Sequence, residues 1–449
     1  MLNKITAKIG FSENGFIRYL KNTVWMFAEF GFTLIVSLFV GLAAAKYLGP
    51  EFYGVMVFSL TLYAVSSMIS GFGFESIAIR DALKDESKIG PIYGTLMVTK
   101  IITTIALFLI SVFILNAKYD GMKFYAGLFI VSSLLLQPIN VLKLFFNMKV
   151  QAKYVSIANI SSASVSAILK ILFIIFGKTV EYFALTVFID AFITGVLLLF
   201  FYLYNKNDFK SWTFDKSYFK FLFKSNWPLI IIVIVGAIYS RVNIFMISKL
   251  LGDKEVGIYG VALRLTDVFY SIPEILITSL FPAIMAAKIS SMVEYEKRIK
   301  SFLRLLVTPF ILVSFLTYLL GPWFINTFLG AQFAASSFIL IILIWTIPLN
   351  VFYVVTMRYL TVENFIFKSM LRPLIALILI IIFNYLFFMK FQSLEAFAYS
   401  NILAYFIAFF LMDVIFSDSR RLFLMKIDSV LFPFKYIINL MKKRNSRKS

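Results

Sequence analysis

The chain has 449 residues, of which 61% are hydrophobic and 15% charged, and its mean hydropathy is +0.90. A soluble domain with that balance would have too little polar surface, so we predict a polytopic membrane protein. Cysteine and histidine are both absent, which excludes disulfides, thiolate chemistry and imidazole metal sites. The net charge of +20 follows from the enrichment of Lys and Arg in the cytoplasmic segments of membrane proteins, and we expect no nucleic-acid partner.

Apolar runs of membrane length predict twelve transmembrane helices, six on each side of a polar break. In chain order they cover about 21–45, 53–77, 93–115, 122–147, 154–177, 181–204, 226–249, 256–285, 302–321, 332–357, 366–389 and 394–416. With the N-terminus in the cytoplasm, the inner segments hold 33 Lys and Arg and the outer segments hold 7. This bias predicts a multi-pass protein of the cytoplasmic membrane with both termini in the cytoplasm.

The expected fold is therefore an all-α integral membrane protein in four parts. These are an N-terminal six-helix lobe, a cytoplasmic amphipathic linker, a C-terminal six-helix lobe and a basic cytoplasmic tail, at 1–204, 205–224, 225–416 and 417–449.

The linker and the tail both mix apolar and basic residues. In the linker we expect Asp215 to cap a short helix that lies on the inner leaflet through Phe219, Leu222 and Phe223. In the tail we expect an interfacial helix bent at Pro433, with a basic end attracted to anionic lipid. The alternative for the tail is a frayed end that only sets the topology.

Two short segments of the chain are similar. Lys46–Gly54 and Lys249–Gly257 share Lys, Leu and two Gly at a constant offset of 203 residues. This similarity predicts that the two halves are repeats, with Leu48-Gly49 and Leu251-Gly252 at equivalent turns on the outer face. The alternative is that any short membrane hairpin favours glycine and lysine at its turn.

Ionisable residues inside the predicted helices are candidate functional residues, because charges deep in a bilayer are costly and usually face a cavity. Arg241 and Arg264 lie at one depth, roughly 12 Å from the outer face at 1.5 Å per residue. With Lys170 they could hold an anionic part of a cargo. The alternative is pairing between helices without a ligand.

The acidic residues Glu29, Asp190, Asp267 and Glu274 are candidates for ion coupling or for such pairing. Glu75 and Asp413 are expected to meet water, Arg80 or Arg420 at the inner face. Four prolines inside predicted helices are candidate hinges: Pro138, Pro228, Pro273 and Pro348.

The sequence contains no phosphate-binding loop, zinc spacing or nucleophile elbow. We therefore expect no enzyme activity, no metal and no cofactor.

The motifs around the predicted seventh and eighth helices resemble the polysaccharide-export family of lipid-linked oligosaccharide flippases. These are the Wzx-type O-antigen or capsule repeat-unit flippases of the MOP superfamily, related to MATE drug exporters and the lipid II flippase. The residues that carry the resemblance are Tyr239-Ser240-Arg241-Val242-Asn243, Leu251-Gly252, Val256-Gly257-Ile258-Tyr259, Ala262-Leu263-Arg264, Ile272-Pro273 and Leu280-Phe281-Pro282. The first half agrees at Tyr47-Leu48-Gly49-Pro50, Tyr53-Gly54, Gly71-Phe72-Gly73 and Arg80.

The resemblance implies two lobes in a V around a central cavity, alternating access and coupling to an H⁺ or Na⁺ gradient. It implies an undecaprenyl-diphosphate-linked oligosaccharide as cargo, moved from the inner to the outer leaflet of a bacterial cytoplasmic membrane for O-antigen, capsule or exopolysaccharide synthesis. The implied partners are this cargo, membrane lipids and glycan-assembly proteins such as a polymerase. The motifs do not identify the sugar.

One position departs from the family pattern, which often has Asp two residues after the arginine of helix 7. This chain has Asn243, so Arg241 lacks its expected counter-ion and a carboxylate-coupled cycle at this position is in doubt. Two other functions stay open. A MATE-like multidrug or ion antiporter would need a cavity of net negative charge, and a non-transporting scaffold of a glycan pathway would show no transport phenotype.

Overall fold

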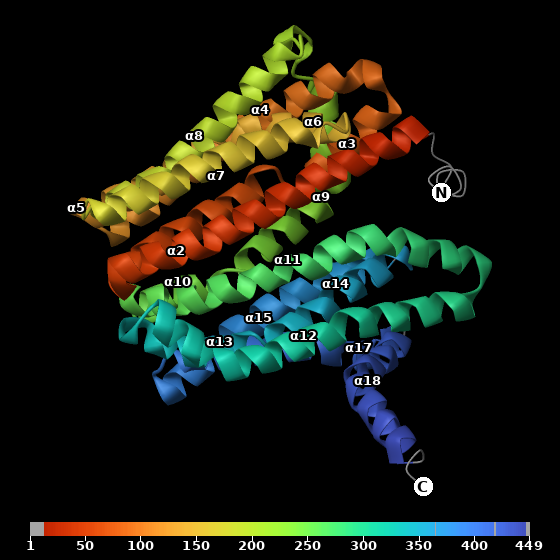
Figure 1. Cartoon of the computed structure of the whole chain (residues 1–449). Coiled ribbons are helices and arrows are strands. Elements are labelled where there is room, and N and C mark those ends of the chain that lie inside the picture. Colours follow the sequence, from red (N-terminus) through yellow and green to blue (C-terminus); the bar gives the residue numbers. More distant parts are fainter. Residues whose placement is uncertain (1–12, 364, 417–418, 446–449) are drawn as a thin grey trace. The chain divides into compact units, whose positions relative to one another are not determined.

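The computed structural model describes residues 13–363, 365–416 and 419–445. Every regular element in these ranges is helical, as predicted (Figure 1). In the first half of the chain the helices are α2 (Glu13–Ser70), α3 (Glu75–Lys84), η1 (Glu86–Lys88), α4 (Ile89–Lys118), α5 (Gly121–Ser132), η2 (Ser133–Asn140), α6 (Val141–Met148), α7 (Ala152–Ile175), α8 (Val180–Tyr204), η3 (Phe209–Ser211) and α9 (Lys216–Tyr239).

In the second half they are α10 (Val242–Leu250), α11 (Asp253–Ser290), α12 (Met292–Phe328), η4 (Ala331–Phe333), α13 (Ala334–Leu343), α14 (Thr346–Val362), α15 (Ile366–Phe391), α16 (Glu395–Tyr405), η5 (Phe406–Leu411), α17 (Met412–Ile415) and α18 (Arg420–Asn445).

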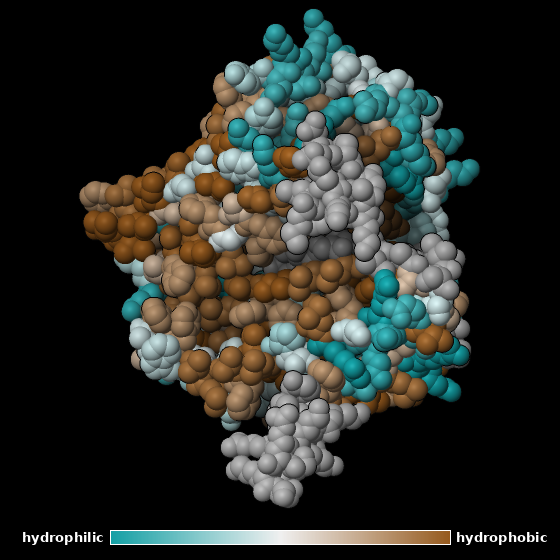
Figure 2. Space-filling view, turned by 45° about the vertical axis from the view of Figure 1, so that its right-hand side comes forward, coloured by the Kyte–Doolittle hydropathy of each residue, from teal (hydrophilic) through white to brown (hydrophobic). Residues whose placement is uncertain are grey.

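Many of these helices are suited to a bilayer. In the described ranges, 10 helices are long and apolar enough to cross a membrane. Figure 2 shows broad apolar surfaces along the helices and hydrophilic residues gathered toward the helix ends. One span, Ile17–Lys84, has 68 residues and breaks at Gly49, so its length is sufficient for two crossings. The protein is thus a multi-pass membrane protein, while the count of twelve helices stays a prediction.

The chain packs into two compact units, Met1–Arg241 and Val242–Ser449. The division falls between α9 and α10, inside the predicted seventh helix, and not at the polar segment 205–224. The cause is that α9 packs against α2 and α4 of the N-terminal unit. The packing boundary therefore coincides with Arg241.

The predicted linker is part of the N-terminal unit. Asp215 caps α9 as predicted, because its carboxylate accepts hydrogen bonds from the backbone N–H groups of Ser217 (2.8 Å) and Tyr218 (3.1 Å). The capped helix is not a short surface segment, however, and continues to Tyr239. Its apolar side packs inside the unit, where Leu222 is fully buried and the ring of Phe223 contacts aromatic rings that follow α2. The prediction that this side lies on the inner leaflet is therefore wrong.

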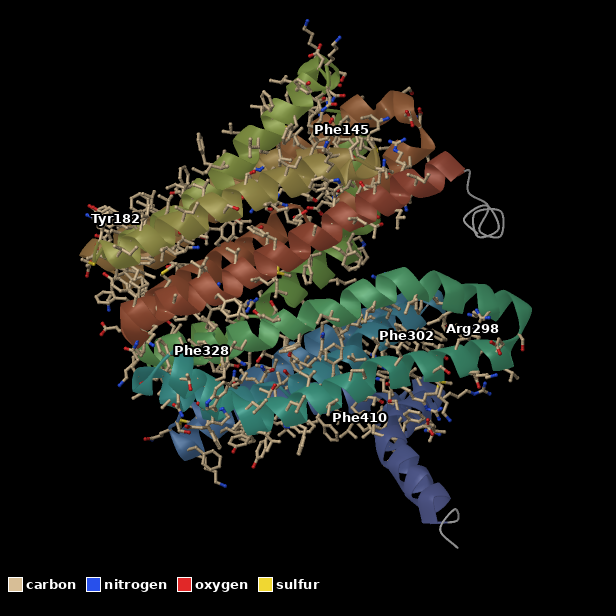
Figure 3. All side chains as sticks on the ribbon, viewed as in Figure 1. Phe145, Tyr182, Arg298, Phe302, Phe328 and Phe410 are labelled. Carbon is tan, nitrogen blue, oxygen red and sulfur yellow. The ribbon has the colours of Figure 1, made fainter. Side chains whose placement is uncertain are left out.

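Glycines explain how closely the linker approaches the helices beneath it. A Cβ atom on Gly90 would lie 2.1 Å from the backbone oxygen of Ser211, and one on Gly94 would lie 2.5 Å from that of Thr213. The neighbouring core of the N-terminal unit is aromatic, with ring contacts from Tyr93 to Phe145, which Figure 3 labels on α6. Only glycine leaves room for the backbone of the linker to cross α4 at this distance.

The two predicted Leu-Gly turns share one backbone geometry. Gly49 has φ 73° and ψ 168°, and Gly252 has φ 102° and ψ −174°. Both conformations are accessible essentially to glycine alone, and both glycines separate two long helical segments. Gly330 (φ 83°, ψ 179°) ends α12 in the same way. The shared geometry agrees with a repeat, whereas superposition of the two halves stays a prediction.

The predicted tail helix belongs to the C-terminal unit. The first half of α18 packs against α12, and its residues Leu422, Lys426 and Ser429 are fully buried. An interfacial helix would leave a lysine such as Lys426 at the membrane surface, so this part of the prediction is wrong. Pro433 lies within α18, and the side chains of the basic end at 442–448 lie outside the described residues.

Candidate functional site: charged networks inside the two units

A hydrogen-bonded network joins three helices of the N-terminal unit around Glu29 of α2. Its carboxylate accepts hydrogen bonds from the hydroxyl of Ser156 (2.8 Å) and from the side-chain amide of Asn159, both on α7. The amide oxygen of Asn159 in turn accepts a hydrogen bond from the Lys143 ammonium on α6 at 3.0 Å. One amide therefore connects a carboxylate and an ammonium group within the membrane-spanning part of the unit.

A second carboxylate and a tyrosine extend this network. Lys143 interacts electrostatically with Glu29 and with Asp190 of α8, and Asp190 also acts on the Tyr63 hydroxyl of α2. That hydroxyl accepts a hydrogen bond from Gln137 (2.5 Å). The charges of two predicted candidates, Glu29 and Asp190, thus both act on one lysine. We call Glu29, Lys143, Ser156, Asn159 and Asp190 the N-unit network.

The local fold explains the position of Lys143. Pro138 lies inside the 3₁₀ segment η2, where residues three apart lie on the same side of the helix. Gln137 and Asn140 are such a pair, and the Asn140 amide donates to the Gln137 side chain at 2.8 Å. Lys143 follows three residues later in α6. The prediction missed it because the positive-inside count assigned Lys143 to a loop, although the spacing 137–140–143 was visible.

An ion pair lies near the end of α2. Lys100 of α4 is buried, and its ammonium lies 2.9 Å from the carboxylate of Glu75. The chain reverses just before Glu75, with φ 51° at Phe72 and 75° at Gly73. A Cβ on Gly71 would collide with the Glu75 carboxylate at 1.9 Å. Glu75 therefore pairs with Lys100 and not with Arg80, which contacts Asp81, so its predicted partner is wrong.

The predicted cavity cations and the acidic candidate Asp267 are distributed over both units. Lys170 (α7) and Arg241 (between α9 and α10) belong to the N-terminal unit, and Arg264 and Asp267 (α11) to the C-terminal unit. All four are half-buried, and each takes part in at least one polar, ionic or ring interaction. Arg241 is therefore not an isolated cation, and a shared cavity stays a prediction. The side chain of Glu274 lies outside the described residues.

Asn243 connects three helices of the C-terminal unit. It is 7% exposed, donates to the Tyr259 hydroxyl of α11 at 2.9 Å and accepts from the Asn384 amide of α15 at 2.8 Å. The position at which the family often has a carboxylate thus carries a neutral amide that donates one hydrogen bond and accepts another. A role of Asn243 in ion coupling stays a prediction.

The candidate hinge prolines coincide with helix irregularities. Pro138 lies in η2, and Pro228 follows a non-helical residue, Asn226, with φ −123° and ψ 18°. Pro348 lies in the first turn of α14, after the break that ends α13, and Pro273 lies within α11. These breaks agree with the bending expected of proline, while motion at any of them stays a prediction.

A fully buried ion cluster joins α15, α17 and α18 in the C-terminal unit. Arg372 and Lys426 both donate to the carboxylate of Asp413, and all three side chains have at most 1% of their surface exposed. Lys426 also donates to the backbone oxygen of Phe409 (2.7 Å), and burial lowers the pKa of Lys426 to about 8. Asp413 therefore does not meet water or Arg420 as expected, because α18 covers it.

A second contact fastens α18 to α12. The Asp428 carboxylate accepts from Arg304 Nε at 2.8 Å and lies 3.3 Å from the Lys300 ammonium. Burial opposes ionisation of Asp428, but the hydrogen bonds from Arg304 and Lys300 outweigh it, so the pKa of Asp428 lies below its usual value. The first half of α18 is thus held by two groups of charges.

The helical architecture defines the class of this protein, which has the fold of the MOP-superfamily transporters. It is similar to the lipid II flippase MurJ in an inward closed conformation, with 15% identity, coverage of 94% of this chain and 93% of that chain, and a TM-score of 0.71. It is also similar to an inward-facing multidrug resistance MATE family transporter of the MOP superfamily, with 15% identity, coverage of 86% and 96%, and a TM-score of 0.68. At these identities the likeness concerns the fold.

The family follows from the sequence. Residues 19–288 match the family described as "Polysaccharide biosynthesis protein", and the match covers more than half of the chain. The chain therefore belongs to this family, which agrees with the resemblance found in its motifs. Comparison with curated proteins finds no match.

Proposed function

We propose that the protein is a flippase that moves polyprenyl-diphosphate-linked oligosaccharides from the inner to the outer leaflet of the cytoplasmic membrane. Membership of the polysaccharide biosynthesis family carries the proposal. The MOP transporter fold, which the lipid II flippase MurJ shares, supports it. The charged side chains inside the membrane-spanning units add support, because such residues are costly in a bilayer and usually functional.

The N-unit network is our candidate for ion coupling. The chain has no histidine, so a carboxylate has to carry any transported proton. Protonation of Glu29 would remove the charge that its hydrogen bonds from Ser156 and Asn159 stabilise and that attracts Lys143. Because these partners lie on two other helices, α6 and α7, a change of charge at Glu29 would alter the packing of α2 against both.

The cargo would present a diphosphate, for which arginine is the best-suited side chain, because its planar guanidinium donates two parallel hydrogen bonds to oxyanions. We therefore retain Arg241, Arg264 and Lys170 as the anion-binding residues. Lysine at position 241 keeps the charge but loses the second parallel bond, so Arg241→Lys should retain part of the activity.

The test measures surface glycan and membrane protein level in the same cells, after the chromosomal copy has been replaced by each variant. Glu29→Gln and Arg241→Ala should abolish export at an unchanged protein level. The matched control is Glu51→Gln, because Glu51 is 62% exposed and pairs only at the surface with Lys123. Full export in both variants, or a loss of export that follows a loss of protein, would exclude these roles.

The same strains separate the two alternatives. A MATE-like antiporter predicts normal surface glycan and increased sensitivity to cationic drugs in the Glu29→Gln strain. A scaffold predicts that a complete deletion stops glycan assembly while point variants of the charged residues have no effect. Accumulation of the lipid-linked oligosaccharide in the inner leaflet is the result that the flippase alone predicts.

A further inference from the structure

The C-terminal unit carries an apolar groove of about 1030 Å³. Seven of its fourteen lining residues are aromatic, and among these described residues Lys390 alone is charged. The lining comes from α12, α14, α15, α16, η5 and α18 and consists of Ile311, Trp345, Pro348, Leu349, Phe352, Phe387, Lys390, Phe391, Tyr399, Ile402, Leu403, Phe406, Phe410 and Val430.

A π-helical turn shapes one wall of this groove. Phe406 and Phe410 both belong to η5, and their rings stack with centroids 5.3 Å apart. Figure 3 labels Phe410 beside α18, where its ring lies 5.2 Å from that of Phe423. The ammonium of Lys426 binds the carbonyl of Phe409 in the same turn and lies 5.4 Å from the ring of Phe352, another lining residue. Because the buried ion cluster holds this wall, the groove is preformed.

The groove is accessible from the flank of the unit. Phe391, Tyr399 and Phe406 are 54%, 42% and 40% exposed, and they lie on helices apolar enough to cross a membrane. From Tyr399 to Phe410 the wall extends roughly 16 Å at 1.5 Å per residue. Lys390 lies at the end of α15, near the turn predicted at the outer face. A long apolar chain with an anionic group beside Lys390 matches this arrangement.

We propose that the groove binds the isoprenoid tail of the cargo, and that Lys390 binds its phosphate when Arg241, Arg264 and Lys170 do not hold it. This inference rests on the proposed function and adds a binding site for the lipid part of the substrate. The double bonds of an isoprenoid fix part of its torsions, so a given length of the chain loses less conformational freedom on binding than the same length of a saturated acyl chain does. Its methyl branches also increase contact with aromatic walls, which a straight acyl chain fills less completely.

The experiment uses the full chain in nanodiscs and undecaprenyl phosphate that carries a photoreactive diazirine in its tail. Crosslinks mapped by mass spectrometry should fall on α14 and η5. Leu403→Trp fills the groove and should reduce labelling at least tenfold, and the milder Leu403→Phe should reduce it less. The matched control is Leu386→Trp, since Leu386 is 53% exposed on α15 but does not line the groove. Lys390→Gln should weaken labelling several-fold, and Lys390→Arg should retain it.

Two results would overturn the inference. The first is labelling that Leu403→Trp and Leu403→Phe leave unchanged in protein of normal size-exclusion behaviour. The second is equal labelling by phosphatidylglycerol with a diazirine on its acyl chain, because the occupant would then be an ordinary phospholipid. The assay needs neither oligosaccharide nor transport. If the probe fails to bind while Glu29→Gln still stops export, the groove proposal fails and the proposed function stands. If the probe binds while no variant affects export, the proposed function fails.

Discussion

Replacing Asp413 by Ala should destabilise the C-terminal unit strongly, because one carboxylate compensates two buried cations. Arg372 and Lys426 are at most 1% exposed and would be left without their counter-ion. Removal of one partner from a buried ion pair costs about 3–5 kcal/mol, and with two stranded cations we expect about 5 kcal/mol. Domain stabilities are about 5–15 kcal/mol, so this loss is a large share of the total.

The pH dependence of this loss has a definite sign. The pKa of Lys426 is about 8 in the folded protein, whereas an unburied lysine has a pKa of 10.5. As the pH rises, Lys426 therefore loses its proton at a lower pH in the folded state than in the unfolded state. Between these pH values the unfolded state binds more protons, and the contribution of Lys426 to stability rises with pH. The Asp413 carboxylate raises the pKa of Lys426, so in Asp413→Ala this pKa lies below about 8 and the variant gains stability with pH while the wild-type lysine is still protonated. The Asp413→Ala defect should therefore be smaller at pH 9 than at pH 7.

The assay is thermal unfolding of the purified protein in detergent at both pH values. About 5 kcal/mol in a unit of this size corresponds to a melting temperature lowered by roughly 10–20 °C. The control is Glu296→Ala, because Glu296 pairs with Arg421, which is 71% exposed, and such surface pairs contribute about 0–1 kcal/mol. If Asp413→Ala melts within about 2 °C of this control, the reasoning is refuted.

Three further predictions concern the backbone, pH and topology. Gly252→Ala forces alanine into a conformation restricted to glycine and should cost about 1–3 kcal/mol in thermal unfolding, whereas Gly236→Ala, within α9, should not destabilise. The lowered pKa of Asp428 means that its contribution to stability is complete above its usual pKa of 3.8 and is lost as pH falls through the lowered value. The difference in melting temperature between wild type and Asp428→Asn should therefore stay constant above the usual pKa and disappear only once the pH has fallen below the lowered value. Single cysteines at Asp120 or Asp253 should react with an impermeant thiol reagent from the outer side, and labelling only from the cytoplasm would overturn the predicted orientation.

The sequence by itself determined the features that depend on local composition and spacing. Long apolar runs predicted a helical membrane protein, because a chain in lipid must satisfy its backbone hydrogen bonds internally. The paired Leu-Gly segments predicted two equivalent turns, and Gly49 and Gly252 share a conformation that glycine alone adopts readily. Asp215 predicted a helix N-cap, which is also a local interaction.

Only the tertiary structure decided which charges meet, because those contacts join residues far apart in the chain. Glu29 and Asn159 are 130 residues apart, and their contact depends on the packing of α2 against α7. The positive-inside count treated Lys143 and Lys426 as topology signals, yet both ammonium groups form hydrogen bonds inside the protein. Hydropathy and charge spacing record which residues are polar along the chain. The identity of their partners depends on how the helices pack, and the sequence alone does not show how they pack.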